Sequence, residues 1–177
     1  MKKLLYCFAI TTILMANECK RSKPVRPNTG DGLPPATQTG ANIFACKIDG
    51  RNWISGTGIS LMNAGISNDT TSLTGVDGDT NYFERMTIRI DGGAYLINNP
   101  FLIPDNFNIS ILWSANKSCN GLLGSGIINS YATQGKITLT RIDSINRVVS
   151  GLFECKIPIS NCDTLLITNG RFDVRTY

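Results

Sequence analysis

Residues 135–177 read GKITLTRIDSINRVVSGLFECKIPISNCDTLLITNGRFDVRTY, and this stretch decides the fold class. Apolar and polar residues alternate over 137–140, 146–157 and 163–168, with turn-forming residues between these segments. Such period-two alternation predicts three successive antiparallel strands. Asn169-Gly170 then predicts a turn into a last short strand over 171–177. We expect the second strand to turn one face inward, made of Val149, Gly151, Phe153, Cys155 and Ile157.

Similar alternation occurs upstream, so the whole folded part is expected to be all-β. Further strands are predicted over 43–48, 52–54, 58–61, 72–76, 83–90 and 107–113, and Asp49-Gly50 predicts a hairpin turn between the first two. Residues 98–106, which contain two prolines, and the polar residues 116–125 are expected to be loops. The prediction is an antiparallel β-sandwich or a partly closed barrel of meanders, with about 8–10 strands.

The length, charge and composition of the chain argue for one domain and against several classes of function. At 177 residues the chain has room for one domain, and 42% hydrophobic residues suffice for a core. The net charge is +4, but the basic residues are not interleaved with aromatic ones, so nucleic acid is not expected as a partner. The chain has no histidine, which excludes Ser-His-Asp and Cys-His catalysis and histidine-ligated zinc.

The N-terminus has the pattern of an export signal. Two lysines precede an apolar run over residues 4–15, which is shorter than the roughly 20 residues of a membrane span. We expect residues 1–18 to be a signal peptide and Cys19 to carry a lipid, although Glu18 departs from the usual lipoprotein box and cleavage after Ala16 is the rival. Residues 19–40 are rich in Pro, Gly and Thr and are expected to form a flexible tether to a β-domain over 41–177. The expected location is the cell envelope, as an outer-membrane lipoprotein whose lipid is its contact with the membrane.

Cysteine parity supports this interpretation. Once Cys7 leaves with the signal and Cys19 carries lipid, an even set of four cysteines remains. Cys155 and Cys162 flank a short loop between two predicted strands, which favours a disulfide between them. Cys46–Cys119 then follows by elimination, although four cysteines allow three connectivities.

Two stretches resemble a known protein family. Residues 33–53 read LPPATQTGANIFACKIDGRNW, and the C-terminal part contains ITLTRIDSINRVVSGLFECKI at 137–157 and ITNGRFDV at 167–174. In this order they resemble the opening and closing motifs of a Bacteroidota lipoprotein family of unknown function. The resemblance implies an exported, usually lipid-anchored β-domain, and it implies no catalytic residue because the family supplies none.

We therefore expect a non-enzymatic binding or structural module, without a cofactor or a metal, whose partner is an envelope protein or a glycan. Loops at the ends of a β scaffold commonly carry function, which makes Phe101, Leu102 and Asn116 candidate contact residues. The aspartates of residues 77–81 (DGDTN) resemble half of a calcium loop, but an Asp-Gly turn is the simpler interpretation.

Two alternatives remain open. One is a hydrolase of envelope or extracellular glycans that uses carboxylates such as Glu84 and Glu154. The other is a lipocalin-like closed barrel that carries a small apolar ligand.

Overall fold

The computed structural model describes residues 30–56, 62–67, 70–78, 83–91, 97–104, 109–117, 123–160 and 162–176. These residues form eleven β-strands in two antiparallel sheets, so the all-β prediction is confirmed. The predicted signal peptide, Cys19 and Cys119 lie outside the described residues.

One sheet has six strands and is built around the C-terminal part of the chain. Its order is β2 (Arg51–Ile54), β1 (Ile43–Ile48), β11 (Leu165–Arg175), β10 (Val148–Ile157), β9 (Gln134–Asp143) and β6 (Pro100–Ile103). Each neighbouring pair is antiparallel. The predicted hairpin at Asp49-Gly50 is confirmed, because both residues have positive φ and Ile48 pairs with Arg51.

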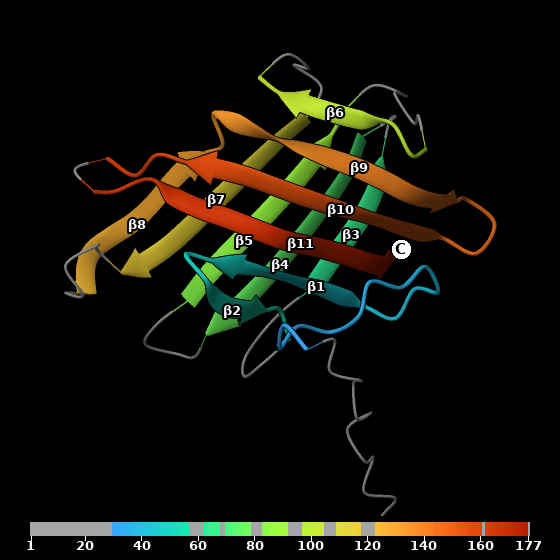
Figure 1. Ribbon diagram of the computed structural model, residues 1–177, viewed down its shortest axis with the longest axis horizontal. Helices are drawn as coiled ribbons and strands as arrows, with labels where there is room; N and C mark the ends of the chain where they lie inside the picture. Colours follow the sequence, from blue (N-terminus) through green and yellow to red (C-terminus); the bar gives the residue numbers. More distant parts are fainter. Residues whose placement is uncertain are drawn as a thin grey trace, which may run out of the picture.

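The second sheet has five strands. Its order is β3 (Met62–Ser67), β4 (Thr70–Gly78), β5 (Phe83–Ile90), β7 (Ile109–Lys117) and β8 (Leu123–Tyr131). This sheet lies behind the six-stranded one, and its strands run at a clear angle to those in front (Figure 1). The two sheets do not close into one barrel, so the sandwich is the correct form of the prediction.

The interior between the sheets is filled by side chains from both inner faces. β10 buries the five residues that alternation predicted, and β5 buries Met86, Ile88 and Ile90 against them. At one end Phe44 makes edge-to-face contacts with Trp53 and Phe153, with ring centroids 5.5 and 5.7 Å apart. Aromatic pairs of this geometry contribute about 1 kcal/mol each beyond the area that they bury.

The expected turn at Asn169-Gly170 is wrong, because β11 continues through it as one strand. The register of β11 shifts here against β1 and against β10, which makes this point a β-bulge. Asn169 takes a positive φ of 53°, and a Cβ on Gly170 would lie 2.4 Å from the carbonyl oxygen of Phe153. The dipeptide therefore supplies a left-handed residue and a close backbone approach inside the sheet, without a chain reversal.

Two expected loops and the last part of the expected tether, residues 30–40, also need correction, whereas residues 19–29 lie outside the described residues. Residues 100–103 form β6, an edge strand paired with β9, where proline is tolerated because one side of the strand has no partner. β7 extends to Lys117, so Asn116 lies in a strand. Residues 30–41, which we call the strap, lie against β1 and the end of β11 (Figure 1) instead of forming a tether.

Candidate functional site

The outer face of the six-stranded sheet, which points away from the other sheet, is hollowed over β9, β10 and β11. One hollow has a volume of about 420 Å³ and is lined by Lys136, Thr138, Leu152, Phe153, Glu154, Asn169, Gly170 and Arg171. A second, of about 270 Å³, is lined by Gln134, Gly135, Glu154, Cys155, Lys156, Leu166, Ile167 and Thr168. Because Glu154 lines both hollows, they adjoin, and we call them together the outer groove.

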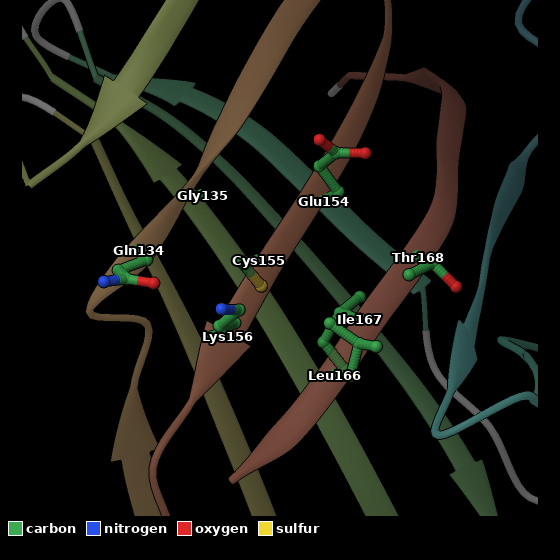
Figure 2. A pocket seen from close by; sticks show the side chains of 8 residues that line it. All are labelled: Gln134, Gly135, Glu154, Cys155, Lys156, Leu166, Ile167 and Thr168. Atoms are coloured by element: carbon green, nitrogen blue, oxygen red, sulfur yellow. The ribbon is translucent and has the colours of Figure 1, made fainter.

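The sheet positions the groove side chains through its register. Leu152 lies opposite Thr138 on one side and Arg171 on the other, so these three residues share one row of the outer face. Lys156 lies opposite Gln134 and Leu166 in another row. Figure 2 shows the smaller hollow, where Lys156 projects from β10 and Leu166 from the neighbouring β11. The bulge at Asn169 separates the two rows on β11.

Two leucines stand out on this otherwise polar face. The side chains of Leu152 and Leu166 are 44% and 47% exposed, although they occupy strand positions where alternation calls for polar residues. Isolated exposed leucines are common on protein surfaces, but here both line a hollow. The groove therefore combines apolar contact area with amide, hydroxyl and charged groups, as ligand sites do.

The strap lies beside the groove and holds one of its lining residues, Arg171. Arg171, which lines the larger hollow, donates from Nη2 to Asp31 at 2.8 Å and from Nη1 to the carbonyl oxygen of Pro34 at 3.0 Å. Leu33 is 1% exposed and packs against Ile43 and Ala45 on the outer side of β1. The strap thereby fixes the Arg171 side chain and covers the part of the outer face beside the groove.

A buried carboxylate on β11 holds the strap in place. Asp173 is 1% exposed and accepts hydrogen bonds from the backbone N–H groups of Thr39, Gly40 and Ala41 at 3.0, 2.8 and 3.0 Å. The hydroxyls of Thr37 and Ser150 donate to it at 2.5 and 2.7 Å. Burial by itself would raise the pKa of Asp173, but these hydrogen bonds outweigh it and lower the pKa. The cluster satisfies itself within the chain, which marks it as structural.

The two glutamates of the hydrolase hypothesis lie on different sheets. Glu84, on β5, is buried, and the Nη2 atom of Arg51 from β2 donates to both of its oxygens at 2.8 and 2.7 Å. Glu154 lies on the exposed outer face of β10 and pairs with Lys136 at 3.1 Å. The structure therefore does not bring this pair together. Asp77 lies directly opposite Glu84 in the β4–β5 register, whereas Asp79 lies outside the described residues.

Two of the three candidate contact residues, Phe101 and Leu102, lie on opposite faces of β6. Phe101 is 6% exposed and belongs to the core, so its proposed contact role is wrong. Leu102 is 49% exposed, as expected, and its neighbour across the strand pair is Lys136 of the groove. Sequence reasoning missed Lys156, Leu152 and Leu166. The available signal was the presence of two leucines at the outward positions of strands whose inward positions were already assigned.

The expected disulfide between Cys155 and Cys162 is wrong. Cys155 is a free, buried thiol on the inner face of β10, and Cys46 is also free and buried, which excludes Cys46–Cys119 as well. Burial raises the pKa of the Cys155 thiol to about 12. The pKa of Cys46 is raised far above its ordinary value, mainly by burial and further by the nearby Cys155 and Glu84. Cys162 is disulfide-bonded, and no described cysteine is left as its partner.

Two general features of the described residues bear on the site. Among them, no group of three or more acidic or cysteine side chains is placed to hold a metal ion. Within the same residues there is no helix of the length and apolar character that crossing a membrane requires.

The comparisons with known proteins add no family. No protein-family model, no curated protein and no solved structure matches the chain. Any functional conclusion therefore rests on the geometry of the site and on the N-terminal sequence.

Proposed function

We propose that this protein is a non-enzymatic binding module of the cell envelope, anchored by a lipid on Cys19, whose ligand occupies the outer groove. The export-like N-terminus supports the location, and the outer groove is the observation that carries the binding role. Its two adjoining hollows and two exposed leucines lie on a sheet whose inner face is packed.

The groove suits binding because its floor is rigid. β9, β10 and β11 are each paired with a strand on both sides, so the backbone under the groove is held by hydrogen bonds. A rigid floor reduces the entropy that a ligand must overcome when it orders the site. The lining offers Lys, Glu, Gln and Thr side chains that can bond a polar ligand, with leucines for its apolar parts.

The two alternatives fit the geometry less well. A glycan hydrolase would need two carboxylates facing one substrate, and Glu84 and Glu154 point to different parts of the molecule. A lipocalin-like carrier would need a cavity in the interior between the sheets, but the rings of Phe44, Phe153 and Phe172 pack against one another there.

Fractionation of cells tests the anchor. In membranes washed with high salt, Cys19→Ala should move the protein from the membrane fraction to the soluble periplasmic fraction, because the lipid is the one proposed attachment that such a wash does not release. Wild-type protein that is already soluble and begins at Asn17 would refute lipidation and favour ordinary cleavage after Ala16.

Co-sedimentation with isolated cell envelopes tests the groove. The full chain carrying Cys19→Ala should sediment with envelopes, and adding Leu152→Ser with Leu166→Ser should weaken this association roughly tenfold or more, because two central apolar contacts are lost. Ile145→Ser is the control, since Ile145 is an exposed apolar residue in the turn between β9 and β10 and lines neither hollow. If the double variant associates fully with envelopes and its melting temperature is unchanged, the binding site lies outside the outer groove.

A further inference from the structure

The charges around the outer groove are not balanced. Two of its cations have partners, since Lys136 pairs with Glu154 and Arg171 with Asp31. Lys156 has no ion-pair partner among the described residues, and the same holds for Lys47 on β1. Lys47 points to the same outer face, because its neighbours Cys46 and Ile48 are buried on the inner one. Two ammonium groups without an ion-pair partner among the described residues thus lie at the side of the groove, near the carboxylate of Asp49, which accepts a hydrogen bond from the N–H of Leu166 at 2.8 Å.

The register gives the spacing of these two cations. Lys156 lies opposite Leu166 on one side of β11, and Lys47 lies opposite Thr168 on the other. They are therefore two strand spacings apart across the sheet, or about 9.6 Å, and two residues apart along β11. Lys156, Leu166 and Thr168 line the smaller hollow (Figure 2), and Lys47 lies beside it, as the partner of Thr168 on the other side of β11. An extended ligand with repeated negative charges matches this arrangement.

The hydrogen-bonding groups in the groove distinguish a glycan from a peptide. Because β10 and β11 are paired on both sides, a peptide cannot add to them as a further strand, and its backbone amides would depend on side chains alone. Gln134, Thr138 and Thr168 present amide and hydroxyl groups, which donate to and accept from sugar hydroxyls. The exposed faces of Leu152 and Leu166 can pack against the C–H surface of a sugar ring.

We infer that the outer groove binds a carboxylate-bearing polysaccharide, a chain of uronic acids, with Lys156 and Lys47 pairing with its carboxylates. This inference rests on the proposed binding role of the groove and names its ligand class. Ammonium–carboxylate hydrogen bonds are charge-assisted and become weaker as salt screens them.

Direct binding to defined probes tests the ligand class. The full chain carrying Cys19→Ala is titrated by calorimetry with oligogalacturonate, with an uncharged glucan oligosaccharide of equal length, and with poly-glutamate. Oligogalacturonate should bind, more weakly at higher salt, and the other two probes should bind at least tenfold more weakly. Lys156→Gln and Lys47→Gln should each reduce the affinity roughly three- to fivefold, the value of one partly exposed charge pair.

Two variants control for general charge effects and for folding. Arg85→Gln removes one positive charge from an exposed position on β5, in the other sheet, and should leave affinity unchanged. Lys156→Arg keeps the charge and should retain most of the affinity. Equal losses in Arg85→Gln and Lys156→Gln would show that net charge alone attracts the glycan, and would overturn the assignment of the two lysines.

The outcomes separate this inference from the proposed function. Binding of poly-glutamate or of the uncharged glucan in preference to oligogalacturonate, lost with Leu152→Ser and Leu166→Ser, would overturn the uronate assignment while the groove remained the binding site. If no probe binds and the leucine double variant still associates with envelopes, both proposals fail.

Discussion

Asp173 shows how one residue can determine the conformation of a segment more than 130 positions away in the chain. Five donors surround its carboxylate, three of them backbone N–H groups of the strap. Carboxylates that accept several backbone hydrogen bonds favour the charged form, even when buried. The strap therefore takes its shape from a negative charge on β11, and its own composition gives no sign of this.

Asp173→Asn should destabilise the protein by about 3 kcal/mol, because an amide replaces a charged acceptor and turns its own N–H groups toward other donors. Urea denaturation at pH 7 measures the loss. Asp163→Asn, at an exposed position, is the control and should change stability by less than about 0.5 kcal/mol.

The lowered pKa of Asp173 also predicts how the stability difference between the wild-type protein and Asp173→Asn depends on pH. Since the folded pKa of Asp173 is lowered, its stabilisation is present above the unfolded value of about 3.9 and is lost as the pH falls through the lower folded value. The stability difference between wild type and Asp173→Asn should therefore be constant near neutral pH and shrink below about pH 4. A difference that stayed constant down to pH 2 would contradict the assignment of this carboxylate as the charged acceptor.

Gly170 is the second residue whose identity the fold requires. Gly170→Ala should cost about 2–3 kcal/mol, because the new Cβ would meet the carbonyl oxygen and the ring of Phe153, and only backbone movement relieves this contact. Gly50→Ala is an informative comparison, since Gly50 has φ of +81° but open space around it. That variant should cost about 1 kcal/mol from the left-handed conformation alone. Equal costs, measured by thermal unfolding, would show that the bulge relaxes easily.

At the scale of the elements, alternation predicted the strands whose two faces differ. β10 is the clearest case, because each residue assigned to its inner face is buried. The same reasoning already placed Cys155 beside Phe153 on that face, which argues against a bridge to a cysteine in the following loop. The disulfide prediction failed because it used loop length alone and ignored the direction of the side chain.

Other elements could not be predicted because their cause is not local. The strap is polar and proline-rich, and its order depends on Asp173, on Arg171 and on the apolar surface of β1. β6 contains Pro100, which is compatible with a strand only because β6 lies at the edge of the sheet. The outer groove depends on the pairing of β9, β10 and β11, which alternation within single strands does not reveal.

Leu33→Ala tests whether the strap is a structural element of the domain. The side chain is 1% exposed, so its truncation should cost about 2–3 kcal/mol. Amide hydrogen exchange at Thr39, Gly40 and Ala41 should also become faster, as the strap opens more often. Leu152→Ala is the control, and should change stability by less than about 0.5 kcal/mol because this leucine is already half exposed. Unchanged exchange in Leu33→Ala would show that Asp173 holds the strap without help.

For the molecule as a whole, the thiols report whether the sandwich is closed. Cys46 and Cys155 face the interior between the sheets, and burial keeps them in the unreactive thiol form. In the native protein, iodoacetamide should leave both unmodified, and in denaturant without a reductant it should modify both. Rapid native labelling of either one would mean that the sheets separate readily.

Peptide mapping of the same unreduced material identifies the partner of Cys162. With Cys46 and Cys155 free, we expect Cys119, the one other cysteine beyond residue 30 of the sequence. A peptide linking Cys162 to Cys155 would contradict the inward orientation of Cys155.

The position of Asp173 also decides how the molecule carries mechanical load. Tension on an anchor at the N-terminus reaches the strap before it reaches β1. The strap resists this tension through three consecutive backbone N–H groups, which all donate to the carboxylate of Asp173. Because these hydrogen bonds bear the force together, the strap should protect β1, the strand that follows it, until they break. In single-molecule pulling from the N-terminus, a first rupture that releases only about a dozen residues and vanishes in Asp173→Asn would reveal it, whereas one cooperative rupture in both proteins would rule it out.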